Sequence, residues 1–184
     1  MTPENWPPNI NYLQESVWNE SALNSSKTFR KEGLPCLTSL VSLQNRLKIM
    51  KTPPGHPSTG YGLYATEDIY PNSFILNYTG KVQLDSFISA TNDYCIHLHE
   101  GVSIEANTDG NEARFINDYF GIAKRPNVAF DTYVDGNGNF NSGVFSLNKT
   151  IRAGEELLVT YGLDFWRSRG ITRSGPEWDD SWDE

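Results

Sequence analysis

Two polar residues stand among apolar neighbours in the segment Gly110–Phe130. Arg114 and Asn117 are flanked by core-type side chains, and Asn127 follows ten residues after Asn117. Polar groups that are buried must find hydrogen-bond partners, so such a cluster is either a structural knot or a binding site. This segment is therefore the first candidate for chemistry in the chain.

Histidines offer a rival chemistry, a metal site. His97 and His99 are two apart in a strand-like run, where they would point to one face and could bind a metal with Glu105 or Asp93. We favour a chain without a metal, because these residues do not make a convincing ligand cluster. His56 lies in a Pro-rich loop, where we expect it to be exposed. A hydrolase is disfavoured too, because no nucleophile motif stands in a suitable setting.

Cys36 and Cys95 are the only cysteines of the 184 residues. Two are too few for a structural zinc site or a disulfide framework. We expect two free, buried thiols in a reducing compartment. No apolar run approaches the ~20 residues of a membrane span, and the N-terminus lacks the regions of a signal peptide. The expectation is an intracellular protein without a membrane partner.

The chain is acidic, with a net charge of −8. This charge disfavours direct nucleic-acid binding by the domain and favours a basic partner. Five of the negative charges lie in the last eleven residues, where no Lys or Arg is present: Glu177, Asp179, Asp180, Asp183 and Glu184. That tail is either a solvated disordered end or an attractor of a cationic partner.

Short strands must position these residues. Seven runs of four to eight residues are rich in aromatic or branched side chains and are bounded by turns: 62–66, 73–79, 94–98, 102–106, 127–134, 143–148 and 156–160. The turn Asp135–Asn139 holds residues that tolerate positive φ, so it predicts a hairpin. The pattern indicates a mostly β (α+β) fold and excludes a doubly wound sheet, which needs long crossover helices.

Helices are expected in three places. Apolar residues recur at helical spacing from Thr38 to Lys51, and cations gather at the end of that run. Residues 81–89 and 162–169 resemble short helices. Residues 1–30 show no sustained period and predict a loose arm that could drape over the domain.

Four segments in one order resemble the SET domain of protein lysine methyltransferases: Gly60–Ile69, Ile75–Val82, Gly110–Val128 and Ile151–Gly162. The resemblance implies a β-clip of short curved sheets with a C-terminal pseudoknot, stitched by Arg114, Asn117 and Asn127. It divides the chain into a partly flexible N-terminal arm (1–37), an N-flanking helix and loop (38–59), the SET domain (60–162), a C-terminal closing helix (163–173) and an acidic tail (174–184).

The resemblance also implies S-adenosylmethionine as cofactor, held against the knot. Glycine lets main-chain groups approach a ligand closely, which suits the first motif. An Asn amide offers both a donor and an acceptor. The cofactor-binding residues that the family pattern implies are Gly60, Tyr61, Gly62, Arg114, Phe115, Asn117, Asp118, Tyr161 and Trp166.

Two catalytic residues are implied, Tyr161 and Tyr94, and a substrate channel lined by Tyr78, Tyr94, Val159, Tyr161 and Phe165. A lysine has a pKa of about 10.4 in solution and must lose its proton before it attacks a methyl group. Desolvation and a nearby positive charge both favour the neutral amine. Phenol oxygens can then orient it, and neither a metal nor a strong base is required.

The chain departs from the family pattern in three ways. Asp118 and Tyr119 stand where the family usually has His and Ser or Cys, which puts cofactor affinity in question. Cys-rich zinc elements that flank many relatives are missing, so Phe165 or Trp166 is our candidate to cover the site. Val159 stands where the family often has Phe or Tyr, two residues before the catalytic Tyr, and predicts more than one methylation.

The expected function is a protein-lysine N-methyltransferase that uses S-adenosylmethionine, acts in the nucleus as a chromatin regulator and has a histone tail as its favoured substrate. A cytoplasmic location also stays open. Two alternatives remain: a methyltransferase for a non-histone protein, and a catalytically degenerate SET module that binds a basic protein as a scaffold. A homodimer is possible.

Overall fold

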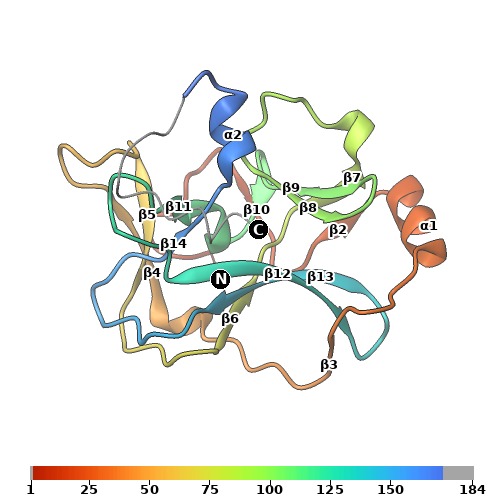
Figure 1. Cartoon of the computed structure of the whole chain (residues 1–184), viewed down its shortest axis with the longest axis horizontal. Helices are drawn as coiled ribbons and strands as arrows, with labels where there is room; N and C mark the ends of the chain where they lie inside the picture. The colour runs from red at the N-terminus through yellow and green to blue at the C-terminus, as the bar shows by residue number, and fades with distance from the viewer. Residues whose placement is uncertain (1, 172–184) are drawn as a thin grey trace.

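Two four-stranded sheets contain most of the strand residues of the fold (Figure 1). One has the order β3 (Cys36–Leu37), β12 (Val128–Asp135), β13 (Phe140–Ser146) and β6 (Phe74–Asn77). The other has the order β2 (Val17–Trp18), β7 (Lys81–Leu84), β9 (Val102–Glu105) and β8 (Cys95–His99). Neighbours are antiparallel, except that β3 pairs with β12 and β2 with β7 in parallel.

Three two-stranded sheets and two α-helices complete the computed structural model, which describes residues 2–171. The sheets join β1 (Asn11–Tyr12) to β10 (Asp109–Gly110), β4 (Leu47–Lys51) to β5 (Tyr61–Ala65), and β11 (Asn117–Asp118) to β14 (Leu158–Val159). The helices are α1 (Glu20–Thr28) and α2 (Leu163–Arg167), with 3₁₀ turns at Gln44–Arg46, Asp85–Phe87 and Glu112–Phe115. The expected mostly β fold of short sheets and few helices is confirmed.

All seven predicted strand runs contain a strand, and the hairpin between β12 and β13 is confirmed. Its turn is organised by the Asp135 carboxylate, whose Oδ1 accepts from the backbone N–H of Asn137 at 2.9 Å and of Asn139 at 2.8 Å. Gly138 has φ +81°, the left-handed conformation that glycine adopts without strain. The short helix near residue 163 is also confirmed as α2.

The helix expected from Thr38 to Lys51 is wrong. The chain makes the 3₁₀ turn Gln44–Arg46 and then β4, which pairs with β5 from Leu47 opposite Ala65 to Lys51 opposite Tyr61. Val41, part of the apparent apolar stripe, is 78% exposed. Strand pairing and burial of Ile49 outweigh the weak helical preference of the segment. The expected helix at 81–89 is likewise replaced by β7 and the turn Asp85–Phe87.

The N-terminal arm contains more structure than the sequence suggested. It adds β1 to β10 and β2 to β7, and between them and β3 it forms α1. Asn19 caps α1 by accepting from the backbone N–H of Ser21 at 2.9 Å. Ala22 of this helix is fully buried, and Ser26 Oγ lies 2.6 Å from His99 Nε2. The arm therefore drapes over the domain as an ordered layer.

The C-terminal strand β14 lies between two parts of the segment Gly110–Phe130, namely β11 and the region of Asn127. This arrangement corresponds to the expected pseudoknot. On one side it pairs with β11, Asn117 opposite Leu158. On the other, the Asn127 amide donates to the carbonyl of Glu156 at 2.7 Å and accepts from the N–H of Leu158 at 2.7 Å. Backbone groups buried at such a crossing need matched partners, and Asn127 supplies them.

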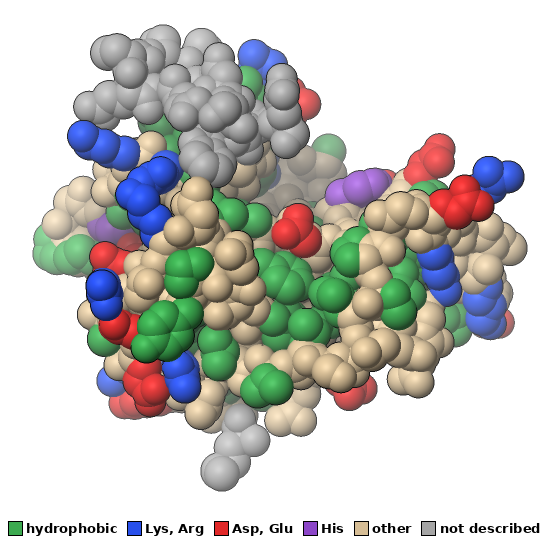
Figure 2. Space-filling model, turned by 60° about the horizontal axis from the view of Figure 1, so that its bottom comes forward, with side chains coloured by type: hydrophobic (Ala, Val, Ile, Leu, Met, Phe, Trp, Pro, Cys, Tyr) green, Lys and Arg blue, Asp and Glu red, His purple; other side chains and the backbone are tan. Residues whose placement is uncertain are grey.

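The lower side of Figure 1 is brought forward in Figure 2, where hydrophobic side chains gather around the middle and most charged ones stand nearer the edges.

None of the helices within residues 2–171 is long and apolar enough to span a membrane. The expected acidic tail and the last two residues of the expected closing helix lie outside the described residues.

Candidate active site

Two cavities meet at one wall. The smaller, about 230 Å³, is lined mainly by aromatic and aliphatic side chains. The larger, about 570 Å³, lies between the loop before β5, the N-terminal arm and α2. Five residues line both cavities: Asp93, Tyr94, Arg114, Tyr161 and Phe165. The structure thus brings together residues from three separate parts of the sequence at the junction of two pockets.

Tyr161 follows β14 and is fixed at both ends. Its backbone N–H donates to Asp118 Oδ2 at 2.7 Å, and its hydroxyl donates to the carbonyl of Ile116 at 2.8 Å. Burial raises the pKa of Tyr161, and the nearby Asp118 carboxylate adds to the rise. The phenol therefore stays neutral at physiological pH, with an oxygen lone pair left to accept a hydrogen bond.

Tyr78 comes directly after β6 and lines the smaller cavity. It is 4% exposed, and its ring meets Phe130 edge-on with centroids 5.5 Å apart. Its hydroxyl has no hydrogen-bond partner among residues 2–171, and burial raises the pKa of Tyr78. A buried phenol hydroxyl without a partner is uncommon, and a ligand in the cavity would satisfy it.

Arg114 separates the two cavities as a buried cation. Its Nε donates to the carbonyl of Ala106 at 2.9 Å, and its guanidinium lies over the rings of Tyr94 at 4.0 Å and Phe115 at 4.9 Å. Burial lowers the pKa of Arg114, but a guanidinium starts so high that it keeps its charge. Tyr94, 36% exposed, forms the outer side of this stack.

Five of the residues that the sequence predicts to bind the cofactor line the larger cavity: Gly60, Tyr61, Phe115, Asn117 and Trp166. Gly60 has φ +114°, a conformation that favours glycine. Asn117 Nδ2 donates to the carbonyl of Tyr61 at 3.1 Å and to Glu156 Oε1 at 2.8 Å. Both amide hydrogens are thus engaged, and Oδ1 has no partner within the described part of the chain.

Three expected site residues lie elsewhere. Gly62 is not among the residues that line the larger cavity; its Cα faces the Glu156 carboxylate, with which a Cβ would collide. Asp118 turns away from the cavity and accepts from the N–H of Tyr161 and the indole of Trp166. Val159 is 2% exposed and is not among the residues that line the smaller cavity, whereas Ile116 and Phe130 are.

The helix α2 covers the shared wall. Phe165 contacts Tyr161 edge-on with centroids 4.8 Å apart, and Trp166 stacks on Tyr161 with centroids 6.2 Å apart. Trp166 Nε1 donates to Asp118 Oδ2 at 3.1 Å. Arg169 lies over Phe165 at 3.6 Å and forms an ion pair with Asp93. Two polar contacts thus fasten α2 and the residues that follow it over the site.

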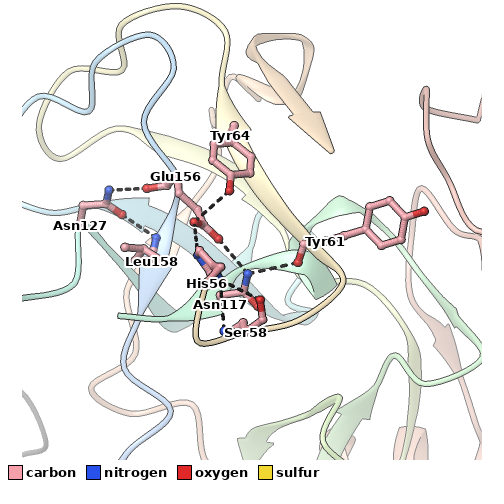
Figure 3. Close-up of polar contacts among 8 residues, drawn as sticks. All are labelled: His56, Ser58, Tyr61, Tyr64, Asn117, Asn127, Glu156 and Leu158. Atoms are coloured by element: carbon pink, nitrogen blue, oxygen red, sulfur yellow. Dashed lines mark hydrogen bonds and ion pairs between the residues drawn. The ribbon is translucent and has the colours of Figure 1, made fainter. Parts of the chain in front are cut away.

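A further polar cluster was missed from the sequence (Figure 3). Glu156 accepts from His56 Nε2 at 3.0 Å, from the Tyr64 hydroxyl at 3.1 Å and from Asn117. His56 was expected to be exposed and is not, since its side chain is 7% exposed. No local pattern could have identified it, because His56 and Glu156 are 100 residues apart in sequence.

The histidines of β8 do not form a metal site. A register shift lies between His97 and His99; the His97 side chain is 63% exposed, whereas His99 is buried beneath α1. Residues 2–171 contain no group of three side chains that could hold a metal ion. Cys36 and Cys95 are free thiols as expected, but Cys36 is exposed and Cys95 only partly buried.

Comparison with known proteins agrees with the geometry. Residues 60–162 match the family model described as SET domain. The chain is similar to the H3 lysine-36 specific histone-lysine N-methyltransferases of Emericella nidulans (34% identical, covering 57% of this chain and 11% of the relative) and Debaryomyces hansenii (36%, covering 57% and 15%). It is also similar to the histone-lysine N-methyltransferase EHMT1 of Homo sapiens (30%, covering 70% and 10%). The chain thus matches only 10% to 15% of the length of these relatives.

Proposed function

The chain belongs to the SET domain family, and on that premise we propose that it is a protein-lysine N-methyltransferase that uses S-adenosylmethionine and acts on a histone tail. The observation that carries the proposal is the wall shared by two cavities, with Tyr94, Arg114 and Tyr161 in it. One cavity can hold the methyl donor and the other a lysine side chain, so that the two reactants meet at the wall.

The larger cavity fits the donor. S-adenosylmethionine, when bound, supplies a methyl group activated by a positively charged sulfur. Asn117 Oδ1 can accept from the ammonium group of its amino-acid end, and the backbone around Gly60 can approach closely. The aromatic faces of Phe115 and Trp166 suit an adenine ring. Asp118 does not line this cavity, so the departure from the family's His leaves these contacts in place.

The smaller cavity suits a lysine. Its apolar lining strips water from the side chain, and the Arg114 guanidinium repels a second cation, so both lower the pKa of an entering amine. The hydroxyl oxygens of Tyr161 and Tyr78 can accept the amine's N–H groups and aim its lone pair at the wall. Positioning two reactants in this way supplies much of the acceleration without a general base.

The edge strand β8 gives the substrate a place beside the smaller cavity. It is the last strand of its sheet, and Cys95, Ile96 and His97 line the cavity. A peptide can add to such an edge as a further strand and insert one side chain. The acidic chain favours a Lys/Arg-rich peptide, and histone tails and a nuclear location fit the names of the relatives.

Two alternative functions can be distinguished from this proposal by experiment. A non-histone protein substrate would leave the same site in use, so methyl transfer to purified core histones and nucleosomes must be compared with transfer to whole-cell extract. A scaffold without catalysis would bind no donor, and calorimetry with S-adenosylmethionine detects this. Labelled methyl groups on a mapped histone lysine would support the proposal. Label on other proteins alone would instead support a non-histone substrate. A homodimer that completes the groove is tested by sedimentation.

A further inference from the structure

Glu156 is a buried carboxylate held by three side chains. It and His56 are each 7% exposed. Oε2 accepts from His56 Nε2 at 3.0 Å and from Tyr64 at 3.1 Å, while Oε1 accepts from Asn117 Nδ2 at 2.8 Å. A carboxylate removed from water requires such compensation. The three donors come from β4–β5 and its loop and from the knot, so one anion joins separate parts of the fold (Figure 3).

The carboxylate fixes the rotation of the Asn117 amide. With Nδ2 bound to Glu156 and to the carbonyl of Tyr61, a flipped amide would place an oxygen against two other oxygens. Only one orientation therefore survives, with Oδ1 left to accept from a ligand in the larger cavity. If Glu156 moved, Asn117 would lose this constraint.

His56 holds the opposite side of the carboxylate and the loop before β5. Its Nδ1 lies 2.7 Å from the carbonyl of Ser58 and 3.1 Å from the Ser58 backbone nitrogen, so the ring lies against the loop's own backbone. Ser58, Thr59 and Gly60 line the larger cavity, whereas His56 is not among the described residues that line either one. Any effect of His56 on a ligand must pass through Glu156 or this loop.

We infer that His56 is a positioning residue for methyl-donor binding: through Glu156 it locks the Asn117 amide, and through Ser58 it sets the loop beside the donor. The inference rests on the proposed function. Neither contact involves the reacting atoms, so His56 acts on donor affinity and leaves the lysine cavity unchanged.

Two isosteric variants separate the contacts. The amide nitrogen of His56→Gln can occupy the place of Nε2 and donate to Glu156, whereas that of His56→Asn reaches only the place of Nδ1. Loss of a donor to a buried carboxylate is expected to weaken S-adenosylmethionine binding about tenfold. We expect this rise in Kd and KM for the donor in His56→Ala and His56→Asn, with kcat and the peptide KM unchanged. His56→Gln should restore most of the affinity.

Lys51→Gln serves as a matched control, because Lys51 is an exposed residue at the near end of β4 and is not among the residues lining either cavity. Equal donor affinity in His56→Asn and His56→Gln would overturn the inference, and so would a joint loss of kcat and peptide KM. If His56→Ala does not fold, the inference is tested by comparing the donor affinities of His56→Gln and His56→Asn, provided that the two variants have equal melting temperatures.

A readout without donor keeps this test apart from the proposed function. The Asn117 side-chain amide signals, identified by their loss in Asn117→Asp, should shift and broaden in His56→Asn but not in His56→Gln. Wild-type protein that binds no S-adenosylmethionine would defeat the proposed function, while these amide signals would still report on His56. Unchanged signals in both variants would reject the positioning role.

Discussion

The indole of Trp166 donates to Asp118 Oδ2 at 3.1 Å, and the same oxygen accepts the backbone N–H of Tyr161 at 2.7 Å. One buried carboxylate thus joins the closing helix to the residue at the centre of the site. Asp118, 2% exposed, is where the family usually has His. We expect this carboxylate to hold α2 in place.

Trp166→Phe should therefore weaken the attachment of α2 to the site without unfolding the protein. The change removes the indole N–H but leaves an aromatic ring, and a lost hydrogen bond of this kind costs about 1 kcal/mol. We expect a several-fold rise in the KM for S-adenosylmethionine with a small drop in melting temperature. A donor KM equal to wild type would show that α2 does not close this cavity.

Tyr78→Phe should cost no stability, because the hydroxyl that it removes has no partner within residues 2–171. Methyl transfer should fall or its product distribution change, because the amine loses an acceptor. Tyr133→Phe is the matched control: Tyr133 is also 4% exposed, but its hydroxyl donates to Asn77 at 3.0 Å away from both cavities. That variant should lose about 1 kcal/mol and keep its activity. A Tyr78→Phe variant that is less stable but fully active, beside a Tyr133→Phe variant that is stable but less active, would contradict the role given to Tyr78.

The His99 ring predicts a loss of stability in mild acid. Burial lowers the pKa of His99, which stacks on Phe29 at 4.4 Å and meets Ser26 of α1. A lowered folded-state pKa means that the unfolded chain binds the proton first, so stability is full above pH ~6.5 and falls as the pH drops below it. Urea unfolding between pH 7.5 and 5 measures this against His99→Gln, whose curve should be flatter over the window. If the pH dependence of stability is the same in wild type and His99→Gln, His99 is not the cause of the loss in acid.

The product of the reaction tests the expectation drawn from Val159. Val159, two positions before Tyr161, is smaller than the Phe or Tyr that the family often has there, and this difference predicts room for more than one methyl group. Mass spectrometry of a peptide at completion should therefore find dimethyl- or trimethyl-lysine. Monomethyl-lysine alone would count against this expectation.

The strands and the hairpin were predictable because turn residues and β-rich runs are local signals. The helix expected at 38–51 was wrong because β4 gains its partners from β5, and pairing of this kind outweighs local periodicity. β1 and β2 are two residues long and exist only through partners 98 and 64 residues away in sequence, so no pattern marks them. The site segments were found through their family resemblance, whereas His56 was hidden by its distance from Glu156.

The proposed role of Tyr161 is tested by the transfer of labelled methyl groups from S-adenosylmethionine to core histones, measured side by side for wild type and Tyr161→Phe. The variant loses one hydrogen bond to Ile116 and should keep its fold and its donor affinity. The shared-wall account predicts label on lysine with wild type and a rate lower by about 10²-fold with the variant, because the amine is no longer aligned. No transfer to any protein by wild type, or a near-normal rate with Tyr161→Phe, would contradict it.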